Sequence, residues 1–168
     1  MASLGGSTLL RANVDSYQRK DTMARRTFFS FHYELDVWRA SQVRNSNIVR
    51  SQTEPSFIEA GIWEDAKTKG EEALKKLIKD GLYNTTVTVV LIGSQTSSRP
   101  WVKYEIEQSI ERGNGLLGVY IHNIKDQNQN TASKGTNPLP SGYATYDWIN
   151  DEGYANLGSW IDKAYDER

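Results

Sequence analysis

The feature that most constrains the fold is a nearly continuous apolar run in the middle of the chain, TTVTVVLIGS at 85–94. Most of its residues are β-branched, and Gly93 interrupts the run. Side chains of this kind fit a pleated strand, and apolar character without alternation is typical of a strand covered on both faces. The run therefore predicts a central strand of a parallel sheet that is packed between helices.

Other segments alternate between strand and helix character along the chain. The composition of RRTFFSFHY (25–33) and GLLGVYIHNI (115–124) predicts two more buried strands. PSFIEAGIWEDA (55–66) predicts a short strand or strand-like segment that ends near Trp63. Four or five strands that alternate with helices predict an α/β fold, a flavodoxin-like doubly wound parallel sheet with helices on both faces. The expected helices are 34–52, 70–81, 98–112 and 146–168, and 125–142 is expected to be a polar loop.

Each expected helix has a predicted buried face, taken from the spacing of its apolar residues. Gly81 stands where a C-terminal cap of the helix at 70–81 is expected. The predicted buried residues are Leu35, Trp38, Val43 and Val49; Leu74, Leu77 and Ile78; Val102, Ile106 and Ile110; and Trp148, Ile149, Leu157, Trp160 and Ile161.

Composition and charge exclude several classes of protein. The 168-residue chain has no cysteine, which excludes thiol catalysis, disulfides and cysteine-ligated metal. Its 20 basic and 21 acidic residues give a net charge of −1, so no nucleic-acid partner is predicted. No segment approaches the roughly 18 apolar residues that a membrane span needs, so no membrane partner is predicted either. A chain without cysteine fits a cytoplasmic location.

The length of the chain suits one domain. Residues 1–22 are polar and low in periodicity, and they contain no apolar core of signal-peptide length. We expect them to be a leader or an artificial extension outside the core. Residues 23–168, which begin at Met23, are expected to form the single domain.

Several common catalytic and cofactor motifs are absent from the sequence. It contains no Gly-x-Gly-x-x-Gly fingerprint, no P-loop and no Gly-x-Ser-x-Gly elbow. Two histidines without cysteine are too few for a typical zinc site, so no metal is predicted. His32, at the expected end of the first strand, either faces a pocket or is a hydrogen-bonded structural histidine. His122 lies on a buried strand away from the other strand ends, which favours a structural role.

Glu105 lies near the buried face of the expected helix at 98–112. At about 100° per residue it stacks one turn after Trp101, beside the apolar stripe. A carboxylate at the edge of a core is costly unless it is paired or lies in a solvated cleft. The pattern leaves both possibilities open: a functional carboxylate in a cleft, or a surface ion pair with Lys103, Arg112 or Arg99.

Ligands of doubly wound sheets bind beyond the carboxyl ends of the strands, near the point where the strand order reverses. In this chain that rule predicts a site among residues 31–33, 63–65 and 93–95, together with the start of whichever helix lies beside them. The WED at 63–65 has two interpretations. It either binds a base or sugar, or it ends a strand and provides a helix-capping aspartate.

Several motifs, in order and at matching spacing, resemble those of the TIR-like domain of bacterial antiphage defence, in particular the ThsB component of Thoeris systems. They are SFHY, WEDA, VLIGSQT and W-V-x-Y-E-I, followed by IHNIKD and SKGTNP. The resemblance extends from about Arg26 to Asp162. It departs from the family pattern in three places: the segment after TNP is short, 34–58 is only loosely similar, and 1–22 has no counterpart.

The resemblance implies a flavodoxin-like TIR fold and an NAD-using enzyme. TIR domains of this kind cleave NAD at the nicotinamide–ribose bond. ThsB-like proteins respond to phage infection by making an ADP-ribose-derived signal, expected to be a cyclic ADP-ribose isomer. The signal activates a partner effector, ThsA, an NAD-consuming protein. NAD is then the substrate and no cofactor is implied, while a phage-derived trigger and a homo-oligomer are possible further partners.

The resemblance also assigns roles to residues. The catalytic glutamate of the family lies in a W-x-x-x-E motif on the helix after the third strand, which implies that Glu105 is catalytic. A carboxylate beside the ribose can bind its hydroxyls and stabilise an oxocarbenium-like transition state. Aromatic rings can stack on the substrate, and the backbone amides of a strand-end turn can bind phosphate oxygens. The expected substrate-binding residues are Phe31, His32, Trp63, Gly93, Ser94 and Trp101.

Two other functions compete with this one. The chain could be a non-enzymatic TIR adaptor that acts by self-association or partner binding, although a pure adaptor has no need of a carboxylate at position 105. A nucleotide-binding or response-regulator domain fits poorly. SFHYELD stands where such a domain has an acidic cluster after its first strand.

Overall fold

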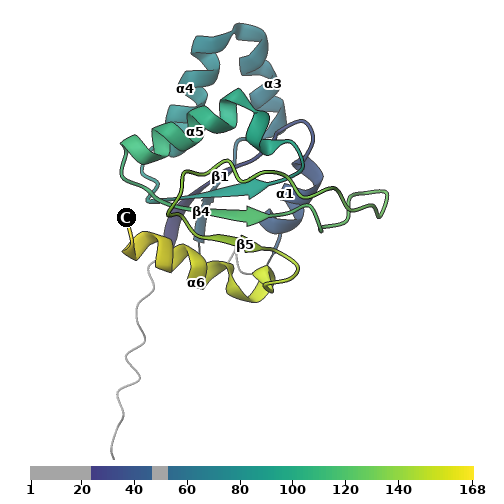
Figure 1. The fold of residues 1–168 in the computed structure, drawn as a ribbon. Helices are drawn as coiled ribbons and strands as arrows, with labels where there is room; N and C mark the ends of the chain where they lie inside the picture. Colours follow the sequence, from purple (N-terminus) through teal and green to yellow (C-terminus); the bar gives the residue numbers. More distant parts are fainter. Residues whose placement is uncertain (1–23, 47–52) are drawn as a thin grey trace, which may run out of the picture.

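The protein is built on one parallel sheet with helices on both faces (Figure 1). The computed structural model describes residues 24–46 and 53–168. The strand order is β2-β1-β3-β4-β5, and every neighbouring pair is parallel. The predicted flavodoxin-like, doubly wound sheet is therefore confirmed. Its strands are β1 (Arg25–Ser30), β2 (Thr53–Ser56), β3 (Val87–Ile92), β4 (Gly115–Tyr120) and β5 (Thr145–Asp147).

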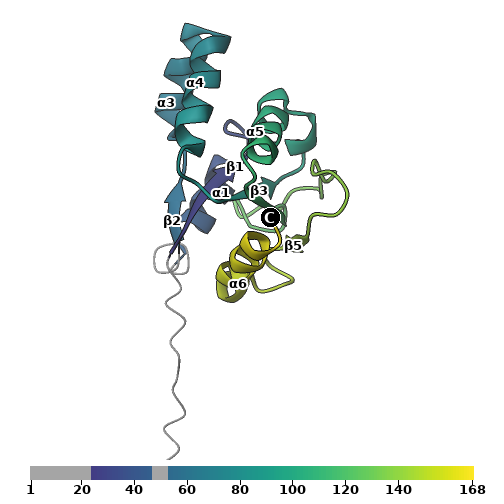
Figure 2. The same cartoon turned by 90° about the vertical axis from the view of Figure 1, so that its left-hand side faces the viewer.

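The strand order decides which face each helix covers. The chain passes from β1 to β2 in one direction along the sheet and from β2 through β3 to β4 in the other. Right-handed connections in opposite directions place their helices on opposite faces. The connections that run from β2 through β3 to β4 place α4 and α5 on one side of the sheet, and α6, which follows β5, lies on the other (Figures 1 and 2). The helices are α1 (Val37–Arg44), α3 (Ala60–Lys69), α4 (Glu71–Leu82), α5 (Pro100–Glu111) and α6 (Gly153–Asp166), with a 3-10 turn, η1 (Thr96–Ser98).

Strand β3 is the centre of the core, as its apolar run predicts, and all six of its residues are buried. Val89 lies between Phe29 of β1 and Leu117 of β4, and none of the three is exposed. Helix α4 packs closely on this sheet at Gly81, where an added Cβ would lie 3.0 Å from the ring of Phe28. The prediction that Gly81 caps the helix is wrong, because α4 continues to Leu82.

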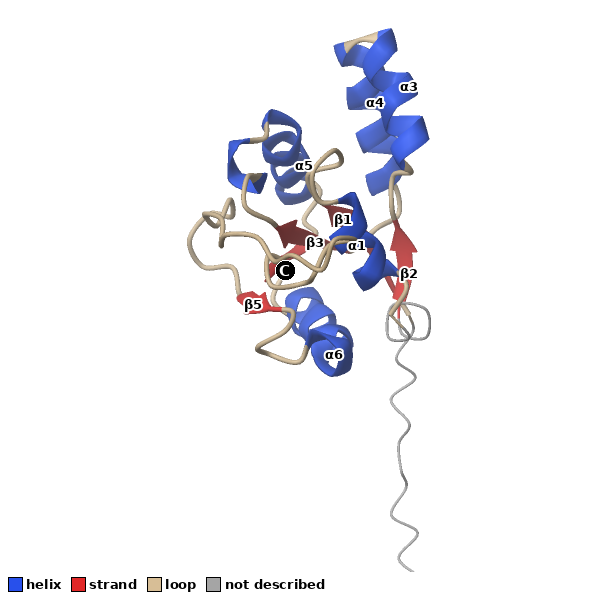
Figure 3. Cartoon of the chain, turned by 90° about the vertical axis from the view of Figure 1, so that its right-hand side faces the viewer, coloured by secondary structure: helices blue, strands red, loops and turns tan. Residues whose placement is uncertain are grey.

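The expected strand at 55–66 is wrong over most of its length. Strand β2 ends at Ser56, and Trp63 lies on α3. Trp63 and Ala66 are buried three residues apart, which is a helical spacing that a short apolar run hides. Helices α3 and α4 are separated by Gly70, whose φ of 107° suits a residue without a Cβ. The two helices lie side by side and project beyond the sheet (Figures 2 and 3).

Several predicted buried faces are also wrong in part. Leu35 and Trp38 are 43% and 48% exposed, because α1 instead buries Arg39, Ala40 and Val43. Ile110 of α5 and Ile149 before α6 are exposed too. The buried positions that are confirmed include Val43, Leu74, Ile78, Val102, Ile106, Trp148, Leu157 and Ile161.

Two expectations concern residues that the structure does not describe. The proposed leader, 1–22, and the predicted core residue Val49 lie outside the described ranges. Within those ranges, every helix is too short or too polar to cross a bilayer.

Candidate active site

A cavity of about 270 Å³ lies beyond the carboxyl end of β1. Three segments line it: residues 31–34 after β1, Trp63 and Lys67 on α3, and residues 99–102 at the start of α5. In this sheet β1 stands between β2 and β3, where the connections change direction. The cavity therefore lies at the edge of the sheet where doubly wound folds bind ligands.

Aromatic rings form the walls of the cavity. The rings of Tyr33 and Trp63 stack, with centroids 4.1 Å apart and an angle of 20° between their planes. Phe31 is tilted against Tyr33 at 4.5 Å, and Trp101 meets Trp63 edge to face at 6.3 Å. Flat apolar surfaces of this kind suit the planar ring of a base or a pyridine.

Glu105 lies behind the wall of this cavity and is 0% exposed. The hydroxyl of Tyr33 donates a hydrogen bond of 2.8 Å to its Oε1, and the hydroxyl of Ser30 donates to its Oε2. Because Tyr33 also lines the cavity, its side chain is the link between the cavity and the carboxyl group. The alternative of a surface ion pair with Lys103, Arg112 or Arg99 is not what the structure contains.

The local sequence explains this position. The buried residues of α5 recur at helical spacing, and Glu105 takes one of these positions together with Val102, Ile106 and Ser109. The helix thus directs a carboxyl group toward β1 rather than toward solvent. Ser30, the last residue of an otherwise apolar strand end, supplies the hydroxyl that faces it.

Burial changes the acidity of this group. Removal from water disfavours the charged carboxylate and raises the pKa of Glu105 to about 8, against the opposing effect of the Ser30 and Tyr33 hydroxyls. Burial and the neighbouring carboxyl also raise the pKa of Tyr33 well above its usual value. Near neutral pH the enclosed Glu105 is therefore mostly a neutral acid.

A row of buried polar groups fixes α5 on the sheet below Glu105. The hydroxyl of Ser109 donates to the Glu105 carbonyl oxygen at 2.7 Å and lies 2.8 Å from the hydroxyl of Thr88. The side-chain amide of Asn114 donates to Thr85 and Thr88 at 3.0 and 3.2 Å. Each of these groups has a partner, so the row holds the helix in register without an unsatisfied buried atom.

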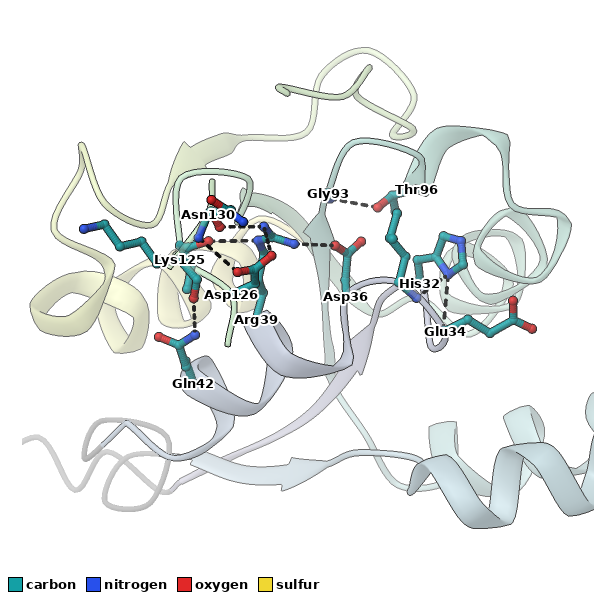
Figure 4. Close-up of polar contacts among 12 residues, drawn as sticks. His32, Glu34, Asp36, Arg39, Gln42, Gly93, Thr96, Lys125, Asp126 and Asn130 are labelled. Atoms are coloured by element: carbon teal, nitrogen blue, oxygen red, sulfur yellow. Dashed lines mark hydrogen bonds and ion pairs between the residues drawn. The ribbon is translucent and has the colours of Figure 1, made fainter. Parts of the chain in front are cut away.

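His32 borders the cavity and has a structural contact as well. Its Nδ1 accepts the backbone N–H of Glu34 at 3.3 Å and of Leu35 at 3.2 Å, which shapes the turn after β1 (Figure 4). Burial, and then the positive charge of Arg99, lower the pKa of His32. A neutral imidazole with Nδ1 as acceptor carries its proton on Nε2.

A second polar network lies beside this turn, around the buried carboxylate of Asp36 (Figure 4). Nη1 of Arg39 lies 3.8 Å from Oδ1 of Asp36. Arg39 also donates to the carbonyl oxygens of Ile124 at 2.8 Å and Asn130 at 3.1 Å, which ties the loop after β4 to α1. Burial raises the pKa of Asp36 to about 6.

Gly93 and Ser94 do not line the cavity. The backbone N–H of Gly93 donates to the Thr96 hydroxyl at 2.8 Å, and an added Cβ on Gly93 would lie 2.1 Å from Oδ2 of Asp36. This glycine is therefore packed against the Asp36 network. The other four expected binding residues, Phe31, His32, Trp63 and Trp101, all line the cavity in front of Glu105.

The sequence prediction assigned no role in this site to Ser30, Tyr33 or Arg99, although Tyr33 lies within the predicted range 31–33. Ser30 interrupts an apolar strand, and a polar residue in such a strand needs a partner, which is a signal that could have identified it. Tyr33 and Arg99 carry no such signal, because their roles depend on where side chains point in space. No group of three or more His, Cys, Asp or Glu in the described ranges could hold a metal ion.

Comparison with known proteins shows one family that the chain resembles. Residues 28–126 match the profile of the family described as "Thoeris protein ThsB, TIR-like domain". The chain is 45% identical over 147 residues to a Bacillus cereus (strain MSX-D12) protein named "Putative cyclic ADP-D-ribose synthase ThsB1". That alignment covers 86% of this chain and 76% of the relative.

Proposed function

Because the chain belongs to the family of Thoeris ThsB proteins with a TIR-like domain, we propose that it converts NAD into a cyclic ADP-ribose isomer and nicotinamide. The name of the Bacillus cereus relative, which describes a cyclic ADP-ribose synthase, supports this activity. NAD is the substrate, and the proposed reaction uses no further cofactor.

The observation that carries the proposal is the position of Glu105 behind an aromatic cavity at the switch point of the sheet. Cleavage breaks the bond between ribose C1′ and the pyridinium nitrogen, and the bonding electrons leave with nicotinamide. The leaving group is already cationic, so it needs no proton. A carboxylate beside the ribose would stabilise the positive charge that develops there.

The second half of the reaction closes the ring. A nucleophile of the same molecule, rather than water, bonds to C1′ and loses a proton, which gives a cyclic product. A cavity that closes around the bound substrate would favour this outcome, because it would exclude water and hold the reacting groups in place. Phe31, Trp63 and Trp101 would supply the enclosing rings, with His32 at the border.

The site must open before it can act. Glu105 is closed off from solvent and hydrogen-bonded to Tyr33, so the Tyr33 side chain has to move for the carboxylate to reach a ribose. Opening hydrates the carboxylate and lowers its pKa toward the ordinary value, which produces the charged form that the chemistry needs.

The family places this activity in antiphage defence. In this proposal residues 23–168 form one domain in the cytoplasm. A phage-derived trigger activates this domain, and a homo-oligomer is a possible active form. The cyclic product then activates the effector ThsA by diffusion. The competing adaptor function is favoured by one observation, the exposed apolar side chains of Leu35, Val37 and Trp38 around the start of α1.

The test uses small molecules filtered from lysates of phage-infected cells that express this chain. The filtrate is added to the effector, and the loss of NAD is followed. We expect activation by the wild-type filtrate and none by Glu105→Gln. Glu107→Gln, an exposed glutamate two residues further along α5, is the matched control and should activate. If wild type and Glu105→Gln protect cells equally and neither filtrate activates, the adaptor function replaces the enzyme.

A further inference from the structure

Arg99 is a cation at the cavity that has no ion-pair partner among the described residues. It lines the cavity, and with the described residues its side chain forms one hydrogen bond, from Nη2 to the Gln95 side-chain oxygen at 3.3 Å. Its Nε is buried without a hydrogen-bond partner among the described residues. No carboxylate oxygen of those residues forms an ion pair with it. A buried guanidinium donor without an acceptor is costly, unless a ligand supplies the acceptor.

The other charges at the cavity already balance each other. Lys67 forms an ion pair with Glu34, which is the acidic residue of the lining. His32 has its pKa lowered by burial and by Arg99, so it adds little positive charge near neutral pH. Arg99 therefore leaves the cavity with an excess of one positive charge, and an anionic ligand would balance it.

Arg99 also stands at the start of α5, directly before Pro100, the first residue of the helix. The amino end of a helix carries a partial positive charge and unpaired backbone N–H groups. This field has the same sign as the guanidinium. A planar guanidinium binds phosphate oxygens through two parallel hydrogen bonds, which a lysine cannot do.

The size of the cavity indicates which part of a dinucleotide meets Arg99. Its volume of about 270 Å³ is below the roughly 300–1,000 Å³ of pockets that enclose a drug-sized ligand. A whole dinucleotide is larger than this, so only one nucleoside half would fit inside. The phosphates, which join the two halves, would then lie at the border of the cavity.

We propose that Arg99 anchors the diphosphate of the dinucleotide, with the nicotinamide riboside half inside the aromatic cavity and the adenosine half outside it. This inference rests on the proposed function. It assigns the anchor to a side chain at the start of α5 and not to the Gly93 amide, which already donates to Thr96. Arg99 is thus a positioning residue that contacts a part of the substrate remote from the bond that breaks.

The test compares two ligands that differ in the diphosphate and the adenosine attached to it. NAD and nicotinamide riboside are titrated by calorimetry into the full chain carrying Glu105→Gln, which prevents turnover. Arg99→Met is compared with Arg99→Lys and with Arg112→Met, which removes an exposed arginine beyond the other end of α5. Inorganic pyrophosphate, added as a competitor, separates the contribution of the phosphates from that of the adenosine.

Hydrogen bonds between charged groups are strong enough for a clear result. We expect Arg99→Met to reduce the preference for NAD over nicotinamide riboside by roughly 10- to 100-fold, and to abolish competition by pyrophosphate. Arg99→Lys, which keeps the charge without the planar fork, should lose part of the preference. Arg112→Met should leave it unchanged.

Three results would overturn the proposal. If Arg99→Met keeps the preference for NAD over nicotinamide riboside, Arg99 is not the anchor. If the variant loses affinity for both ligands equally, the effect is structural and Arg99 is again not the anchor. In both cases the proposed function stands. If neither nicotinamide compound binds the protein with Arg99 intact, the anchor and the proposed function both fail.

Discussion

The hydroxyl of Tyr33 donates a hydrogen bond of 2.8 Å to the carboxyl group of Glu105, which is 72 residues further along the chain. The same Tyr33 ring stacks on Trp63 at the cavity. One side chain therefore belongs both to the wall of the cavity and to the environment of the buried acid. Four measurable consequences follow from this arrangement and from the networks around it.

The buried acid makes the stability of the fold depend on pH. The folded protein holds the Glu105 proton up to about pH 8, whereas the unfolded chain releases it near pH 4.5. Stability contributed by this group is thus complete below pH 4.5 and is lost as pH rises to about 8. Relative to Glu105→Gln, which does not titrate, the wild type should lose at most about 1.4 kcal/mol per pH unit in this window. Urea unfolding of both proteins from pH 4 to 9 measures the difference, and parallel curves would contradict it.

Removing one hydroxyl should make this acid weaker still. Tyr33→Phe keeps the stacked ring but deletes a hydrogen bond that favours the charged form, so the pKa of Glu105 should rise. The free energy of unfolding should fall by about 1 kcal/mol. Carbon NMR of labelled glutamate side chains measures the pKa. Tyr83→Phe, at an exposed tyrosine directly after the end of α4, is the control and should change neither quantity.

The close contact between two loops makes Gly135 intolerant of a side chain. A Cβ there would lie 2.1 Å from the carbonyl oxygen of Gly93, and a backbone atom cannot move aside cheaply. We expect Gly135→Ala to cost about 2 kcal/mol or more, as strained core substitutions do. Gly61→Ala in α3 has no atom within 4 Å of the new Cβ and should be neutral or stabilising by up to about 1 kcal/mol. Thermal unfolding of both variants tests the contrast, and equal losses would exclude it.

We expect Arg39 to stabilise the charged form of the buried Asp36. Arg39→Met leaves the carboxylate without a cation and the Ile124 carbonyl oxygen without its side-chain donor, whereas the Asn130 carbonyl oxygen still accepts the backbone N–H of Asp126. Removal of one partner of a buried pair costs about 3–5 kcal/mol. The loss should be smaller at pH 5, because the pKa of Asp36 is already about 6 and its acid form carries no charge.

A double variant separates the charge from the hydrogen bonds. Asp36→Asn combined with Arg39→Met should recover part of the loss at pH 8, because the uncompensated charge is gone while the loop still lacks the hydrogen bonds that Arg39 donates to Ile124 and Asn130. Denaturant unfolding of the two single variants and the double variant gives this coupling energy. No recovery would mean that the contacts of Arg39 with the loop, and not its charge, account for the effect.

The fold could be predicted where burial leaves a mark on composition. The run at 85–94 is nearly continuously apolar because β3 is covered on both faces. In the helix at 70–81, apolar and polar residues alternate at helical spacing because one face of the helix meets solvent. Helix α3 was missed because a short apolar run ending in Trp63 fits a strand as well as a helix. Apolar spacing alone places Trp38 in the core, whereas α1 buries its other face.

The location of the site could be predicted more completely than its contacts. Phe31 follows β1 and Trp101 lies in the first turn of the helix after β3, and neighbouring parallel strands bring their carboxyl ends to one edge. The depth of Glu105 could not be read from the sequence, because a shift of one residue in the packing of α5 would place it at the surface. The hydrogen bond from Tyr33 to Glu105 could not be predicted from the sequence either, because it depends on a side-chain rotamer.

The side chain of Tyr33, which both lines the cavity and donates a hydrogen bond to Glu105, also sets how often the site is open. Movement of this ring breaks a stack worth about 0.5–1.5 kcal/mol and a hydrogen bond worth about 1 kcal/mol. At equilibrium, only about one molecule in ten to one in a hundred would then hold Glu105 accessible. The reaction rate without a trigger is therefore set by the fraction of molecules in the open form. Any partner that binds the open form more tightly raises this rate without changing the chemical step.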